Sequence, residues 1–98
     1  MFGNNKKASY KGTAPTYVGK GMRIEGKICG MRPIWIDGDV QGTIDIASEV
    51  IIGEPAIIDA TIRASTIKIN GHVKGELFAS KRIEIMSKGR VKGSVKNL

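Results

Sequence analysis

A short module of the form aliphatic–x–Gly–x–Ile/Val–x–Gly recurs along this 98-residue chain. Each copy alternates an apolar or glycine position with a polar one, which is the period-two pattern of a strand with one buried face. Three copies, at 24–30, 36–42 and 69–75, are close to the consensus. Two looser copies lie at 52–60 and 85–93. Five copies in so short a chain predict a repeat architecture in which each copy adds one layer to a shared core.

The alternation of apolar and polar positions runs from Met22 to Ala64 and resumes, shifted by one residue, from Ile67. No comparable window has the i, i+3, i+4 and i+7 spacing of an amphipathic helix, so we predict an all-β fold. The second aliphatic position of the modules falls at residues 28, 40, 58, 73 and 91, with spacings of 12, 18, 15 and 18. Such spacings predict a β-solenoid of about five short coils, each coil adding one parallel rung to each sheet.

Glycine recurs at inward positions of the modules, where it would weaken a flat strand. We therefore predict corners at these glycines, where the backbone turns and little room is left for a side chain. With the modules aligned on their first aliphatic residue, Trp35 lies beside Ile51 and Lys68 lies beside Glu84 on neighbouring rungs. An apolar pair and an opposite-charge pair each favour adjacent strands, by roughly 0.2–1 kcal/mol.

The first sixteen residues have no periodicity and are small, polar or basic, so we expect 1–16 to be a flexible tail and 17–98 to be the β-helix domain. No apolar run approaches the roughly 20 residues of a membrane span. The tail also lacks the apolar segment of a signal peptide. The single cysteine, Cys29, cannot form an internal disulfide, which favours a reducing compartment and a cytoplasmic protein.

The net charge of +7 raises the possibility of nucleic-acid binding, but its distribution argues against it. Residues 1–32 carry seven basic and one acidic side chain, residues 33–62 carry six acidic and none that is basic, and residues 63–98 carry nine basic and two acidic. This positive–negative–positive pattern is not a continuous stripe that follows phosphates. The stacking aromatic motifs of RNA- and DNA-binding domains are also absent from the sequence.

These modules, the tail and the segments 52–56 and 81–85 together resemble the bactofilins, a bacterial family of polymer-forming cytoskeletal proteins. The resemblance runs from about Thr16 to Val95 and is most specific between Ala64 and Gly93. It implies a right-handed parallel β-helix with three faces, and filaments that form end to end without nucleotide. It also implies a scaffold at the inner face of the cytoplasmic membrane that organises cell shape or cell-wall enzymes, with no enzymatic activity and no cofactor.

We expect the polymer contacts at the two tips of the solenoid, because an uncapped solenoid presents unpaired backbone groups over an open apolar core. The residues expected there are Val18, Met22, Ile24, Val91, Val95 and Leu98. The resemblance also implies an N-terminal membrane-targeting segment, whose residues would be Met1, Phe2, Lys6 and Lys7. A single tail would bind an anionic membrane only weakly, whereas many tails on one filament would bind with avidity.

Several large apolar residues point outward by parity and form a candidate lateral or partner patch: Trp35, Ile51, Ile57 and Phe78. A local covering of neighbouring rungs would explain them equally well. His72 lies at an outward polar position with no partner constellation, so we expect neither a catalytic nor a metal-binding role for it. The acidic middle of the chain could coordinate a cation, but a solvated face that pairs with basic coils of a staggered neighbour explains it better.

Two other functions fit parts of the sequence. Residues 52–58 resemble a hexapeptide repeat, which would place the chain among acyltransferase-like enzymes with a left-handed β-helix. Against this, the period of six is not sustained and no histidine lies in a suitable motif. A basic nucleic-acid-binding module is the third alternative and rests on charge alone.

Overall fold

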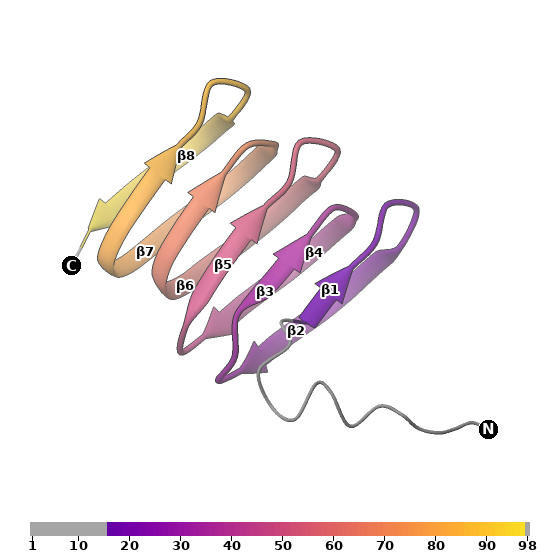
Figure 1. Ribbon diagram of the computed structural model, residues 1–98, viewed down its shortest axis with the longest axis horizontal. Coiled ribbons are helices and arrows are strands. Elements are labelled where there is room, and N and C mark those ends of the chain that lie inside the picture. Colours follow the sequence, from indigo (N-terminus) through magenta and orange to yellow (C-terminus); the bar gives the residue numbers. More distant parts are fainter. Residues whose placement is uncertain (1–15, 98) are drawn as a thin grey trace, which may run out of the picture.

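The computed structural model describes residues 16–97, and every regular element in that range is a β-strand (Figure 1). The strands are β1 (Thr16–Val18), β2 (Arg23–Gly30), β3 (Ile34–Ile36), β4 (Asp39–Ile46), β5 (Glu49–Ile52), β6 (Ile57–Ile69), β7 (His72–Ile85) and β8 (Arg90–Asn97). All of their pairings are parallel. The first strand begins at Thr16, the residue at which the expected tail ends.

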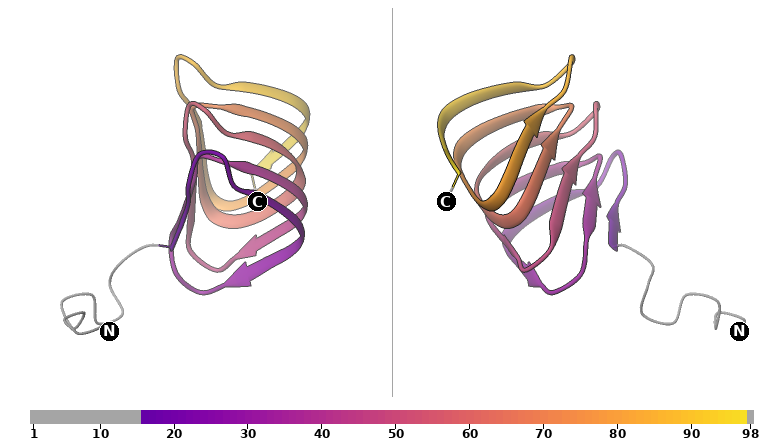
Figure 2. Two further views of the ribbon diagram at one scale, coloured as in Figure 1. Left: turned by 90° about the vertical axis from the view of Figure 1, so that its right-hand side faces the viewer. Right: turned by 60° about the vertical axis from the view of Figure 1, so that its left-hand side comes forward.

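The strands wind into a solenoid of about five coils, as the repeat predicts. One series of rungs runs β1–β3–β5 and continues through the second halves of β6 and β7. The other runs β2–β4 and continues through the first halves of β6 and β7 to β8. In Figure 1 the near strands rise to the right, the far strands return to the left, and the coils advance to the upper left, so the solenoid is right-handed. Figure 2 shows the same stack of coils from two other sides.

Four columns of inward side chains form one continuous core along the solenoid axis. In the three middle coils every member is at most 2% exposed, because a coil covers it on both sides. The columns are Ile24–Val40–Ile58–Val73–Val91, Ile28–Ile44–Ile62–Leu77–Val95, Val18–Ile36–Ile52–Ile69–Ile85 and Thr16–Ile34–Val50–Ile67–Ile83. At about 25 cal/mol per Å² of apolar surface, these stacked aliphatic chains are the main source of stability.

The predicted glycine corners are confirmed. Gly26, Gly42, Gly75 and Gly93 have φ angles between +130° and +138° and lie within β2, β4, β7 and β8, respectively. A Cβ on Gly42 would collide with the carbonyl oxygen of Gly26 on the coil below, and Gly93 stands in the same relation to Gly75. Glycine is required there because both the backbone conformation and the space above the previous coil exclude a side chain.

The predicted register of the first copy is wrong by four residues. Ile24, and not Ile28, pairs with Val40, so the first coil spacing is 16 residues rather than 12. Ile28 instead pairs with Ile44. The module Ile-x-Gly-x-Ile-x-Gly matches itself when it is shifted by four positions, and the sequence pattern therefore fits either alignment. The other spacings, and the phase shift near Ser65, agree with the pairing of β6 and β7, whose register shifts between Ala64 and Thr66.

The outward ladder follows the prediction. Trp35 pairs with Ile51, and Lys68 pairs with Glu84. The structure extends this ladder to Tyr17, which lies on the first coil and pairs with Trp35 on the second.

Candidate self-assembly and partner surfaces

Within residues 16–97, the N-terminal tip is formed by β1 and β2, and each of these strands pairs on one side only. The inward side chains of Ile24 and Ile28 in β2 are partly exposed, whereas Val40 and Ile44, their partners on the next coil, are fully buried. Met22 is 57% exposed at the edge of the same tip. Within residues 16–97 the N-terminal tip therefore presents free strand edges beside open apolar positions, which together favour pairing with another chain.

The C-terminal tip has the same character in the described residues. Strand β8 pairs only with β7, and the second half of β7 pairs only with β6. Ile85 is 51% exposed and Val95 is 44% exposed, although the residues below them in their columns, Ile69 and Leu77, are fully buried. The apolar core thus continues to both tips, and its burial falls only there.

Of the residues predicted at the tips, Met22, Ile24, Val91 and Val95 lie there with partly or largely exposed side chains. Val18 also lies in the first coil, but it is only 7% exposed. Leu98 lies outside the described residues. Three further tip residues belong with this set: Ile28, Ile83 and Ile85. Their inward parity in the sequence could have identified them, since a residue of a terminal coil has a neighbour on one side only.

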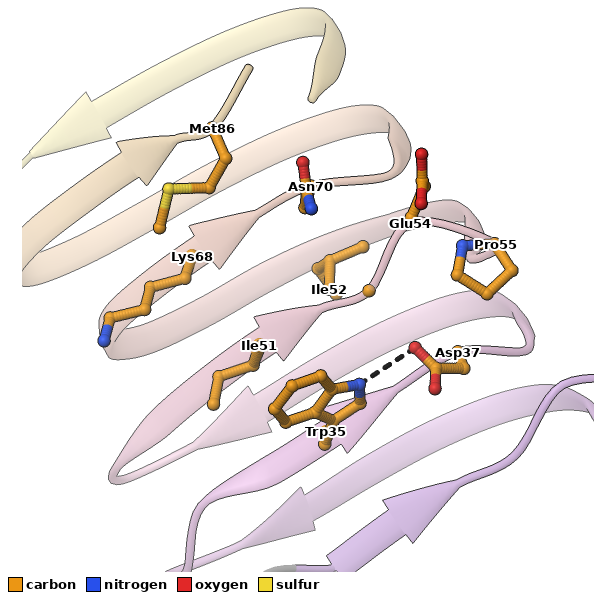
Figure 3. A pocket seen from close by; sticks show the side chains of 10 residues that line it. Trp35, Asp37, Ile51, Ile52, Glu54, Pro55, Lys68, Asn70 and Met86 are labelled. Carbon is orange, nitrogen blue, oxygen red and sulfur yellow. Dashed lines mark hydrogen bonds between the residues drawn. The ribbon is translucent and has the colours of Figure 1, made fainter. Parts of the chain in front are cut away.

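The outward patch centres on Trp35, which is 42% exposed (Figure 3). The indole Nε1 donates a hydrogen bond of 2.9 Å to Oδ1 of Asp37, and the Tyr17 hydroxyl donates one of 2.7 Å to Oδ2 of the same carboxylate. Asp37 thus holds two aromatic side chains of neighbouring coils in place. Sequence reasoning missed this role, because residues 17 and 37 come together only through the coil register.

A groove of about 530 Å³ lies beside Trp35. Gly53 lies in its lining, and a side chain there would run into Asp37. Ile51 and Met86 supply apolar surface, while Lys68 adds a charge at the rim. Figure 3 shows these side chains rising from successive coils around the groove.

Phe78 does not join this patch. It lies on the opposite series of rungs, where it is partly buried and the Arg63 guanidinium carbon stands 5.1 Å from the centre of its ring. The predicted patch therefore divides into a surface around Trp35 and Ile51 and a separate cation–π contact at Phe78. The fourth outward apolar residue, Ile57, is 58% exposed on the same series of rungs as Phe78.

The pKa of Tyr17 is raised above its ordinary value, chiefly because its hydroxyl donates to the Asp37 carboxylate. Loss of the phenolic proton would remove this hydrogen bond and place two negative charges together.

Among residues 16–97, no three His, Cys, Asp or Glu side chains come together as metal ligands would. His72 and Cys29 are both exposed. Two acidic residues of the middle coils are paired instead with lysines: Glu49 with Lys68 at 3.2 Å and Glu54 with Lys88 at 3.1 Å.

The residues predicted to contact a membrane, Met1, Phe2, Lys6 and Lys7, lie outside the described part of the chain. In the part that is described, no helix has the length and apolar character needed to cross a bilayer.

Comparison with known proteins identifies the class to which this solenoid belongs. A family model described as "Bactofilin: Polymer-forming cytoskeletal" matches residues 16–97, the same residues that form the coils. The chain belongs to the bactofilin family.

Two curated relatives come from Myxococcus xanthus (strain DK1622). Bactofilin BacO is 30% identical over 83 residues, which cover 85% of this chain and 66% of BacO. Bactofilin BacP is 24% identical over 81 residues, which cover 83% of this chain and 34% of BacP. The match thus spans just under two thirds of one relative and about one third of the other. No solved structure matches the chain significantly.

Proposed function

We propose that this chain is a non-enzymatic cytoskeletal scaffold whose solenoids stack end to end into filaments without nucleotide. The observation that carries the proposal is the pattern of burial along the core columns, which is complete in the middle coils and is lost only at the two tips. The family description, polymer-forming and cytoskeletal, points the same way.

Stacking has a clear energetic basis. Each tip exposes several aliphatic side chains, and burying one of them fully contributes about 1.5–3 kcal/mol. The free edges of β2 and β8 would also exchange water for backbone hydrogen bonds, which contribute about 0.5–1.5 kcal/mol each. Opposing this are the entropy of association and the net positive charge of both terminal coils, so assembly depends on protein concentration and on salt.

Electron microscopy of the purified protein without nucleotide tests the proposal. Wild type is expected to form filaments built of solenoids stacked end to end. Ile24→Asp places a charge on the inward face of β2 and is expected to abolish them. Lys27→Asp places the same charge on the outward face of β2 and serves as the matched control. Filaments of Ile24→Asp that are as long as those of wild type would show that the N-terminal tip is not the contact.

We further propose that the N-terminal residues attach the filament to the inner face of the cytoplasmic membrane. One phenylalanine contributes about 1.5–3 kcal/mol on burial, and each lysine about 1 kcal/mol near anionic lipid. A single tail carrying Phe2, Lys6 and Lys7 thus binds marginally, and a filament that displays many tails binds by avidity. Membrane attachment and polymerisation are therefore coupled, and the attached scaffold organises cell shape or cell-wall enzymes.

The alternative functions find less support. A right-handed coil is not the left-handed β-helix on which the acyltransferase alternative depends. The acidic band between the basic coils is unfavourable for a surface that follows nucleic-acid phosphates.

A further inference from the structure

Charge forms bands along the solenoid axis. If the coils are taken from the register as 16–32, 33–48, 49–65, 66–81 and 82–97, their net charges are +3, −3, −2, +2 and +4. Coils are about 4.8 Å apart, so the acidic band of two coils is about 10 Å thick. This thickness is close to the Debye length of about 8 Å at physiological ionic strength. A molecule in contact with the side of the solenoid therefore experiences the acidic and basic bands separately.

One side of the solenoid carries charges of both bands. We call it the pairing face, and it consists of the outward residues at two positions on four successive coils: Asp39 and Gln41, Ile57 and Asp59, His72 and Lys74, Arg90 and Lys92. None of the four ion pairs within residues 16–97 involves a charge of this face. The Arg90 guanidinium donates one hydrogen bond of 3.1 Å to the Gly89 carbonyl oxygen, which leaves its other donors free to bind a partner.

We propose that the pairing face is a contact between two copies of this chain that lie side by side in antiparallel orientation. A two-fold axis along the strand direction, placed between the third and fourth coils, reverses the solenoid axis and keeps each residue in its own column. Asp59 then faces Lys74 of the second copy, and Asp39 faces its Arg90. Each of these contacts occurs twice because the interface is self-complementary. At each of the four coil levels, the charge on the face of one copy is therefore opposite to the charge on the face of the other.

An apolar group lies near the centre of the same face. Ile57 is 58% exposed and borders a groove of about 420 Å³ that also includes His72 and Val91. In the antiparallel pair, Ile57 faces His72 of the second copy, so that this exposed side chain becomes covered. An exposed aliphatic residue between two rows of opposite charge is typical of the centre of a protein interface with a polar rim.

The face is small, so a single pair of solenoids binds weakly. Four coils by four residues measure about 19 by 13 Å, or about 250 Å² per copy, against about 800 Å² per partner in a standard stable interface. Solenoids stacked end to end repeat the face along their length and add these weak contacts into side-by-side bundles. The strength of bundling, though not the pairing geometry, therefore rests on the proposed end-to-end assembly.

Charge reversal and charge exchange test the pairing. Lys74→Glu and Asp59→Lys each turn two attractive contacts into repulsive ones, and each is expected to weaken side-by-side association at low ionic strength by about tenfold. The exchange variant Asp59→Lys/Lys74→Glu keeps the net charge and restores both contacts. A mixture of the two single variants is expected to associate as well, because each supplies the charge that the other needs. Far-UV circular dichroism of each variant checks whether it keeps its β structure.

The outcomes separate the alternatives. In a parallel arrangement shifted by two coils, the two columns of the face change places, so Asp59 would face Arg90 and Asp39 would face Lys74. Two copies of the exchange variant would then still repel each other. Failure of the exchange variant to associate therefore overturns the antiparallel geometry, and bundling of Lys74→Glu equal to wild type overturns the pairing face itself. The association of the exchange variant and the bundling of Lys74→Glu are both measured by electron microscopy, on filaments that these variants still form. An absence of filaments in wild type would instead count against end-to-end assembly, and paired single solenoids would then be sought by zero-length cross-linking of Asp59 to Lys74 between isotopically light and heavy chains. If no such link joined light and heavy chains, the pairing face would be refuted in that case too.

Discussion

Replacing Gly42 by alanine is expected to destabilise the solenoid more than the same replacement at Gly26. Both glycines have a φ near +130°, at 130° and 131°, so alanine is strained at either position, at about 1–3 kcal/mol. At position 42 the new Cβ would also meet the Gly26 carbonyl oxygen, whereas at position 26 it would have nothing within 4 Å. Overpacking of this kind adds about 1–3 kcal/mol.

Urea unfolding followed by circular dichroism, at one protein concentration for all variants, measures the difference. The predicted order of stability is wild type, then Gly26→Ala, then Gly42→Ala, with a total loss at position 42 of about 2–6 kcal/mol. The third coil carries Ala60 at the corresponding position, so the prediction concerns only coils whose glycine has a positive φ. Equal losses in the two variants would refute the reasoning, because they would mean that the Gly26 carbonyl oxygen does not lie against the Cβ of residue 42 and that the coil register is different.

Three further predictions concern the core, the aromatic patch and the tail. Ile62→Ala, at a fully buried position, is expected to cost about 2–5 kcal/mol in urea unfolding; Ile57→Ala, at a 58% exposed position on the same strand, is the control and is expected to change stability by less than about 0.5 kcal/mol. Asp37→Asn is expected to lower the pKa of Tyr17 in a spectrophotometric titration, since the carboxylate that raises this pKa is removed. A raised phenol pKa stabilises the folded state below the ordinary pKa of 10.0, and this contribution disappears as the pH rises through the pKa of the folded state. Wild type should therefore lose stability at high pH, and Asp37→Asn should lose less. Phe2→Glu is expected to reduce co-sedimentation with anionic liposomes, and full sedimentation of this variant would exclude the tail as the anchor.

Much of this fold can be predicted from the sequence because one rule, the alternation of inward and outward residues, holds through almost every coil. The shift of phase near Ser65 is visible in the sequence and corresponds to the register shift between Ala64 and Thr66. The outward pairs of Trp35 with Ile51 and of Lys68 with Glu84 follow from the module alignment alone. Parallel stacking in register turns a one-dimensional repeat directly into spatial neighbours.

The parts that could not be predicted depend on absolute register and on side-chain geometry. The first copy fits its neighbours at two alignments four residues apart, and only the packing of Ile24 against Val40 decides between them. The hydrogen bond from Tyr17 to Asp37 joins residues of different coils through angles that no spacing encodes. Phe78 shares outward parity with Trp35, but a parity does not specify which face of the coil a residue occupies.

X-ray fibre diffraction from aligned filaments tests the central claim most directly. If solenoids stack end to end with their coils in register, the strands lie across the filament axis and the pattern shows a meridional reflection at about 4.8 Å. A 4.8 Å reflection on the equator, or ordered filaments with no reflection at this spacing, would contradict end-to-end stacking of these coils.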